Sequence, residues 1–96
     1  MGKSIVTDYD EICFFCGRKA EGEHHLVFGM GNRELCDKDG LTVPTCNNCH
    51  NMGDISSRVH DNPMAEKLSK MLGQAIYEGQ IGTREEFRQR YGKSYL

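Results

Sequence analysis

The chain has 96 residues, 38% of them hydrophobic and none of them tryptophan, and its formal net charge at pH 7 is −2. At this length a single hydrophobic core is only modestly stabilising, so we expect one small domain that needs a cross-link. The negative net charge argues against a protein that coats nucleic acid by bulk electrostatic attraction. The sequence has no apolar run of the length of a membrane span or of a signal peptide, so we expect a cytoplasmic protein with no membrane partner.

The first half of the chain predicts two short strands and little other regular structure. Residues 1–12 are expected to form an irregular arm, and residues 23–28 are expected to form a strand. Residues 29–40 contain three glycines and many charges without a hydrophobic period, which predicts a loop. A second strand is predicted over residues 41–44, where Pro44 would end it.

The second half of the chain predicts helices. Thr45 suits the N-cap of a short helix that fades near Gly53, and the polar stretch 53–62 predicts a loop. Pro63 fits the first position of a longer helix, for which Gly79 is the predicted C-terminal cap. Between these two positions, apolar residues recur at helical spacing: Met64, Leu68, Met71, Leu72, Ala75 and Ile76.

A last helix is predicted near the end of the chain. Thr83 and Glu86 have the spacing of a capping box that opens it, and Gly92 is its predicted end. Phe87 and Tyr91 lie on one face of this helix, because residues four apart are neighbours on a helix surface. We expect both aromatic side chains to pack onto the preceding helix.

Four of the five cysteines form two Cys-x-x-Cys pairs, Cys13 with Cys16 and Cys46 with Cys49, and 29 residues lie between the pairs. Thiols stay reduced in the cytoplasm, so such pairs favour a metal ion over disulfides. Two thiolate pairs can complete a tetrahedral zinc shell with no open position, as in structural zinc sites. We therefore predict one structural zinc ion; the alternative is four unrelated buried thiols. Cys36 is left over, and we expect it to be an ordinary small residue of the predicted loop.

The chain has four histidines, and two of them are adjacent, His24 and His25 on the first predicted strand. Neighbours on a strand point to opposite faces, so these two imidazoles are expected to have different roles. His50 directly follows Cys49, and neighbours on a helix point about 100° apart. If Cys49 faces the zinc ion, His50 faces elsewhere, toward the strand with the histidine pair. This helix would then serve the zinc ion on one side and a second site on the other.

The order of these motifs resembles that of the HNH nucleases: Cys-x-x-Cys, His-His on a strand, then Cys-x-x-Cys-His on a helix. The segments CGRKAEGEHHLVFG, GLTVPTCNNCHN, VHDN, LGQ and REEFRQRYGKSYL look like a compact phage-associated HNH family, and the resemblance covers residues 13–96. In that superfamily a β-hairpin and a helix hold one catalytic metal ion, the ββα-metal motif. The resemblance implies an α+β fold and a single HNH nuclease domain over residues 1–96. It would have a zinc-stapled ββα core over residues 13–53 and a helical part over residues 61–96.

The resemblance assigns a role to each histidine. It makes His24, His50 and His60 ligands of one catalytic divalent ion, which would be Mg²⁺, Mn²⁺, Ni²⁺ or Zn²⁺. It makes His25 the general base that activates a water molecule. This chemistry is consistent, because an imidazole can accept a proton from water near neutral pH. An ion held by few protein ligands also keeps coordination positions open for a phosphate.

One position departs from the family pattern. Many members have Asn-Leu about five residues before the third cysteine, whereas Gly40 and Leu41 stand there in this chain. In the family that asparagine orients the hairpin and the base. Asn32, Asn48 and Asn51 are candidate substitutes, and the sequence does not select among them.

The function implied by the resemblance is that of an endonuclease that hydrolyses DNA phosphodiester bonds and leaves 5′-phosphate and 3′-hydroxyl ends. It also implies a phage or prophage gene, action in the cytoplasm of a bacterial host, and phage packaging proteins as candidate partners. One alternative is a non-catalytic zinc module that binds nucleic acid or protein, which would need the four cysteines and not the histidines. Another is a structural phage protein or an inactivated nuclease, which the missing asparagine and the acidic net charge would favour.

Overall fold

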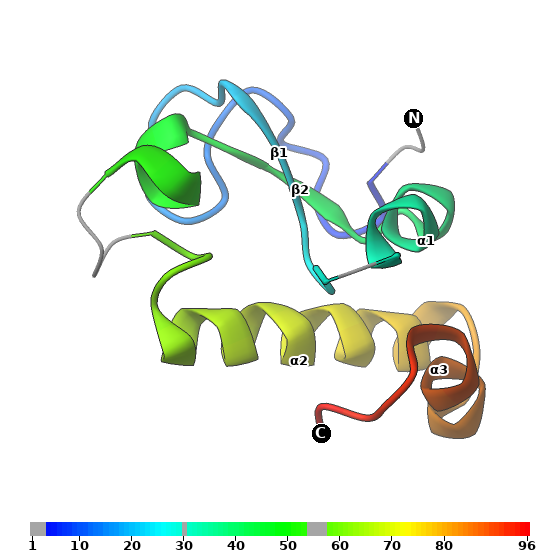
Figure 1. The fold of residues 1–96 in the computed structure, drawn as a ribbon. Coiled ribbons are helices and arrows are strands. Elements are labelled where there is room, and N and C mark those ends of the chain that lie inside the picture. Colours follow the sequence, from blue (N-terminus) through cyan, green and yellow to red (C-terminus); the bar gives the residue numbers. More distant parts are fainter. Residues whose placement is uncertain (1–3, 30, 54–57) are drawn as a thin grey trace.

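The computed structural model describes residues 4–29, 31–53 and 58–96 (Figure 1). These residues form an α+β fold that consists of a two-stranded antiparallel sheet, three α-helices and one π-helical turn. The elements in chain order are β1 (Gly22–His25), α1 (Asn32–Asp39), β2 (Thr42–Thr45), the π-helical turn η1 (Asn48–Met52), α2 (Pro63–Gln80) and α3 (Arg84–Tyr91). The hairpin of β1 and β2 lies across α2, with α1 and α3 near one end of α2 and η1 near the other (Figure 1). No helix in the described part of the chain is long and apolar enough to span a bilayer.

The hairpin places the two adjacent histidines on opposite faces of the sheet. His24 pairs with Val43 and His25 pairs with Thr42 in a regular antiparallel register. His24 is fully buried and His25 is half-buried, as the alternation along a strand requires. The first predicted strand is shorter than expected, because β1 ends at His25 and the chain then turns into the core.

The short helix predicted after Thr45 begins later than expected. Thr45 is the last residue of β2, where it pairs with Gly22, so it is not an N-cap. The helical turn that follows is η1, and its N-cap is Asn47. The loop predicted over 53–62 falls partly on residues 54–57, which lie outside the described residues.

The loop predicted over residues 29–40 is wrong, because these residues include the helix α1. Gly31 and Gly40 have φ angles of 81° and 73°, and they flank the helix instead of interrupting it. The only fully buried side chain of α1 is that of Cys36, whose Sγ lies 3.6 Å from the carbonyl oxygen of Val27. A single buried residue gives no hydrophobic period, which explains why the sequence pattern did not reveal this helix.

The helix α2 begins where the sequence predicts. The Asn62 side chain accepts hydrogen bonds from the amides of Met64 and Ala65, and Pro63 occupies the first turn. Gly79 is not the C-terminal cap, because the helix continues to Gln80 and the Ile81 amide closes it. Gly73 is needed for packing, because a Cβ atom there would lie 2.5 Å from Cγ2 of Val27.

The predicted capping box of α3 is confirmed. The Thr83 side chain accepts from the Glu86 amide, and the Glu86 side chain accepts from the Thr83 amide. Gly92, with a φ angle of 96°, ends the helix as predicted. The ring of Phe87 lies 5.3 Å from that of Tyr77 on α2, so α3 packs on α2 as expected.

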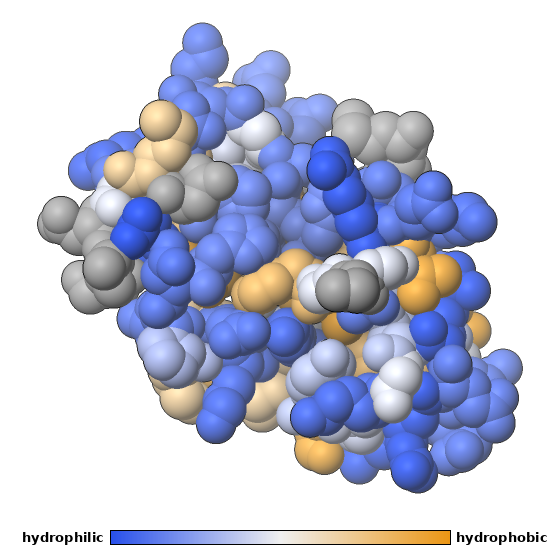
Figure 2. All heavy atoms as spheres, viewed as in Figure 1, coloured by the Kyte–Doolittle hydropathy of each residue, from blue (hydrophilic) through white to orange (hydrophobic). Residues whose placement is uncertain are grey.

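The hydrophobic core lies where the hairpin meets α1, α2 and α3. Its buried members are Leu26, Val27, Cys36, Leu41, Val43, Tyr77, Phe87 and Tyr91. Leu72 and Ile76 of the predicted apolar face of α2 pack against this core. Met64 and Leu68 are more than half exposed, because the core covers the other end of the helix. Figure 2 shows a mostly hydrophilic face, with hydrophobic residues visible between the hairpin and α2 and in small separate patches at the edges.

Candidate metal centres

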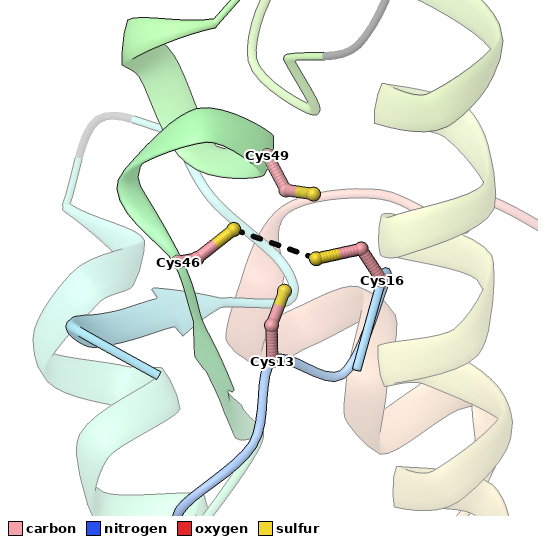
Figure 3. A group of neighbouring side chains, drawn as sticks. All are labelled: Cys13, Cys16, Cys46 and Cys49. Carbon is pink, nitrogen blue, oxygen red and sulfur yellow. Dashed lines mark hydrogen bonds between the residues drawn. The ribbon is translucent and has the colours of Figure 1, made fainter. Parts of the chain in front are cut away.

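The four cysteines of the two predicted pairs lie together at one end of the hairpin. Cys13 and Cys16 come from the turn before β1, Cys46 follows β2, and Cys49 lies in η1. Their Sγ atoms all lie within 4.8 Å of one another, and they point toward a common centre (Figure 3). The Sγ atoms of Cys16 and Cys46 are 3.6 Å apart. Two sulfurs of a tetrahedral zinc site with Zn–S bonds of about 2.3 Å would be about 3.8 Å apart, so this cluster can hold a metal ion such as zinc.

Backbone hydrogen bonds hold the first cysteine pair against the hairpin. The Gly17 amide donates to the Cys13 carbonyl oxygen at 2.9 Å, and the φ angle of 79° at Gly17 permits this tight turn. The Phe14 amide donates to the carbonyl oxygen of Pro44 in β2 at 2.8 Å. The turn is therefore fixed to the strand that leads into the second pair.

The surroundings of the thiols differ within the cluster. Burial opposes ionisation of Cys13, but hydrogen bonds from backbone amides, above all that of Cys46, lower its pKa to about 6. Burial and the neighbouring thiols raise the pKa of Cys49. The lowered pKa of Cys13 favours its thiolate form, whereas Cys49 would lose its proton on binding a cation. Cys36 lies outside the cluster, and burial raises its pKa to about 11.

Three of the four predicted catalytic-site histidines form a second cluster. His24 comes from β1, His50 from η1, and His60 from the segment before α2, and one nitrogen of each lies within 4.8 Å of the others. The Nε2 atoms of His50 and His60 are 2.7 Å apart. Because Cys49 and His50 are adjacent in η1, this single turn contributes to both clusters. This agrees with the expectation that one helix serves the zinc ion on one side and a second site on the other.

His24 has the surroundings of a metal-binding histidine. Ser69 of α2 donates its hydroxyl to the Leu26 carbonyl oxygen at 2.7 Å, so it accepts from Nε2–H of His24, 2.8 Å away. His24 Nδ1 then carries a lone pair, and this buried atom has no hydrogen-bond partner among the described residues. Metal-ligating histidines commonly donate their other ring N–H to such a partner. Ser69 was not predicted as a partner of His24 from the sequence. The only indication in the sequence is that a small polar residue stands on the buried face of the helix.

The three clustered imidazoles are neutral at physiological pH. Burial, together with the neighbouring histidines, lowers the pKa of His24 to about 3. Burial also lowers the pKa values of His50 and His60. Neutral imidazole is the form that binds divalent metal ions, so the donor set fits such an ion.

His25 is not part of the three-histidine cluster. Its Nε2 lies 2.9 Å from Oδ1 of Asp37 on α1, and Glu23 offers a third ligand atom within 4.8 Å of these two. A cavity of about 300 Å³ lies beside both groups. Its lining includes Glu23, His25, Phe28, Arg33, His50 and His60. The cavity therefore connects His25 with two members of the three-histidine cluster.

None of the candidate asparagines is shown to contact His25. Asn32 opens α1, Asn48 is exposed on η1, and the side chain of Asn51 lies outside the described part of the structure. Among the described side chains, Asp37 is the one that hydrogen-bonds to His25, and the sequence did not predict it because residues 29–40 were expected to form a loop.

The family model described as "Protein of unknown function (DUF968)" matches residues 8–82 of the chain. The matched segment contains all four clustered cysteines and all four histidines, and it stops before α3. No curated protein and no solved structure matches the chain.

Proposed function

The chain belongs to the DUF968 family, and we propose that this member is a metal-dependent endonuclease of the HNH type that hydrolyses DNA phosphodiester bonds. The observation that supports this proposal best is the buried lone pair of His24 Nδ1, which has no partner among the described residues and lies beside two more imidazoles. The four-cysteine cluster binds a structural zinc ion in this proposal, and the three-histidine cluster binds the catalytic ion.

The chain holds each proposed ligand of the catalytic ion by a separate contact. Ser69 fixes the tautomer of His24. His50 is fixed by η1, and the Val59 amide, which precedes His60, donates to the Cys49 carbonyl oxygen at 2.8 Å. A divalent ion bound there would neutralise charge on the scissile phosphate and on the leaving oxygen. Three protein ligands leave room in its coordination shell for the substrate.

His25 and Arg33 supply the other groups that hydrolysis needs. His25 lines the cavity without being a member of the three-histidine cluster, so its ring is available to take a proton from water. Arg33 lines the same cavity from α1, and a guanidinium group can donate two hydrogen bonds to one phosphate. The lining of the cavity thus offers both a base and a cation to a phosphate.

A non-catalytic zinc module is the alternative function. Such a module would account for the four cysteines. It would leave without a role three converging imidazoles and a buried nitrogen, His24 Nδ1, that has no partner in the described part of the chain. The resemblance in the sequence also supports a phage or prophage origin, action in the bacterial cytoplasm and phage packaging proteins as partners, and these remain part of the proposal.

The proposal is tested by incubating the purified protein with supercoiled plasmid DNA and Mg²⁺, Mn²⁺, Ni²⁺ or Zn²⁺, with EDTA as the control. We expect nicked or linear DNA with at least one ion and intact DNA with EDTA. If the folded, zinc-containing protein binds the plasmid but leaves it intact with every ion, the zinc-module function replaces the nuclease function.

A further inference from the structure

The contact between His25 and Asp37 involves none of the three histidines that are proposed to bind the catalytic ion. His25 Nε2 lies 2.9 Å from Asp37 Oδ1, and the two side chains are 14% and 31% exposed. The contact joins β1 to α1, which are consecutive elements. It lies on the opposite side of β1 from His24, since adjacent strand residues point to opposite faces.

The helix α1 holds the Asp37 carboxylate in a fixed place. Cys36 is buried in the core, and Asp39 binds α3 through two hydrogen bonds from Arg90, at 2.7 and 2.9 Å, and one from the Tyr91 hydroxyl at 2.7 Å. Asp37 therefore stands between two anchored residues of an eight-residue helix. A carboxylate held in this way can fix the orientation of the ring that it contacts.

The chemistry of this contact determines which nitrogen of His25 is free. An ionised carboxylate only accepts hydrogen bonds, so the proton of the neutral imidazole lies on Nε2. Nδ1 then carries the lone pair. We propose that Asp37 is the positioning residue for His25, holding it as the Nε2–H tautomer so that Nδ1 can take a proton from the attacking water. This inference rests on the proposed nuclease function.

The proton balance of the step is complete without another reactant. The water oxygen bonds to phosphorus, its proton goes to His25 Nδ1, and the P–O3′ bond breaks. The 3′ oxygen takes a proton from solvent, and His25 returns its proton to solvent. While His25 is doubly protonated, the Asp37 carboxylate stabilises its positive charge through the same hydrogen bond.

The same side chains could have a second role, as a cation site, and the experiment must distinguish this role from the positioning of His25. Glu23, His25 and Asp37 offer three ligand atoms within 4.8 Å of one another, which could also hold a divalent cation. The 2.9 Å hydrogen bond favours the positioning role, because it already pairs His25 with Asp37 directly.

The experiment compares the parent with Asp37→Asn, Asp37→Glu and, as a control on the exposed side of the same helix, Glu34→Gln. Asparagine can offer either an oxygen or an NH₂ group, so Asp37→Asn removes the tautomer preference while keeping the size of the side chain. Nitrogen-15 shifts of labelled histidine, assigned with His25→Gln, report the tautomer in zinc-loaded protein without another ion. Plasmid cleavage with saturating Mn²⁺ and DNA reports kcat.

We expect a single Nε2–H tautomer of His25 in the parent and a mixture in Asp37→Asn. We expect kcat to fall roughly 10- to 10³-fold in Asp37→Asn with KM for DNA unchanged, to recover partly in Asp37→Glu, and to stay at the parent value in Glu34→Gln. An unchanged tautomer, or an Asp37→Asn rate equal to that of the control, would overturn the positioning role. Loss of a bound Mn²⁺ ion in Asp37→Asn would overturn it in favour of a cation site. If the parent itself does not cut DNA, the nuclease function fails, and the tautomer measurement still decides whether Asp37 orients His25.

Discussion

The two adjacent histidines of β1 have different partners, and these partners differ in chemistry. His24 contacts a serine hydroxyl that has already donated its proton elsewhere, and His25 contacts a carboxylate. Both contacts place the ring proton on Nε2 and the lone pair on Nδ1. Because β1 points one ring inward and the other toward α1, one strand can supply an ion ligand and a base without competition between them.

Ser69→Ala should weaken binding of the catalytic ion. The substitution removes the hydroxyl that fixes the His24 tautomer, and loss of such a partner typically costs 10- to 100-fold in metal affinity. It also leaves His24 Nε2–H and the Leu26 carbonyl oxygen without that partner, so the free energy of unfolding should fall by about 1–3 kcal/mol. Isothermal titration with Mn²⁺ and thermal unfolding measure the two effects.

Ser94→Ala is the matched control, because Ser94 accepts a hydrogen bond from Gln74 and not from a histidine. Its affinity for Mn²⁺ should equal that of the parent. Equal affinities for all three proteins would show that Ser69 does not support an ion ligand.

The sequence predicted the site residues that carry their own local signal. Cys-x-x-Cys spacing indicated the cysteine cluster, and the motif order indicated the histidines that the structure brings together. Ser69 and Asp37 could not be predicted in this way. They stand 45 and 12 positions from the histidines they contact, and only the folding of α2 and α1 brings them near.

At the scale of elements, the Asp39 carboxylate of α1 binds two side chains of α3. Asp39 accepts two hydrogen bonds from Arg90 and one from Tyr91, and the hydrogen bond to Asp39 raises the pKa of Arg90. Phe87 is fully buried beside Tyr91, with its ring stacked 4.6 Å away. The end of the chain therefore stabilises the helix that presents Arg33 and Asp37.

Asp39→Ala should lower the free energy of unfolding by about 1.5–3 kcal/mol, the usual contribution of hydrogen bonds to a charged group. The reason is that Tyr91, which is buried, loses its acceptor. Denaturant unfolding measures the change. Glu85→Ala is the control, because it breaks only the exposed pair with Arg88 and should change stability by less than about 1 kcal/mol. Equal losses in the two variants would mean that α3 is not fixed through Asp39.

The sequence predicted α2 and α3 well because their starts are encoded locally. Asn62-Pro63 and the pair Thr83 and Glu86 satisfy the first amides of each helix with nearby side chains. The N-cap residues of α1 and η1 give no such bond, because Gly31 has no side chain and the side chain of Asn47 does not cap its helix. The helix α1 is stabilised by distant contacts such as the burial of Cys36 in the core, so no local pattern predicts it, whereas η1 was predicted with its start misplaced at Thr45.

At the scale of the whole molecule, the cysteine cluster and the histidine cluster are mechanically connected. η1 contains Cys49 and His50 in succession, and the Val59 amide bonds to the Cys49 carbonyl oxygen just before His60. A zinc ion on the cysteines would therefore hold two of the three histidine ligands in place. The hydrophobic core lies toward the other end of the hairpin and includes none of the four clustered cysteines.

Cys46→Ser should abolish zinc binding and unfold the domain, because apparent metal-binding free energy in small zinc domains is folding free energy, on the order of 10 kcal/mol. Cys36→Ser is the matched control. It should keep one zinc per chain, although it should cost about 1–3 kcal/mol because the new hydroxyl is buried in the core. Elemental analysis and thermal unfolding give both quantities. A loss of half the zinc in Cys36→Ser would mean that the wrong four thiols have been assigned.

The most direct test of the proposed site is a Mn²⁺ titration of plasmid cleavage by the parent, His25→Ala and His50→Ala. His25→Ala should be about 10²- to 10⁴-fold slower at every Mn²⁺ concentration, because it lacks the base and keeps the ion. His50→Ala should be slow at low Mn²⁺ and should approach the parent rate in excess Mn²⁺, because it has lost only a ligand. Rescue of His25→Ala but not of His50→Ala by excess Mn²⁺ would reverse the two roles. Equal rates for all three proteins would contradict a catalytic site at these histidines.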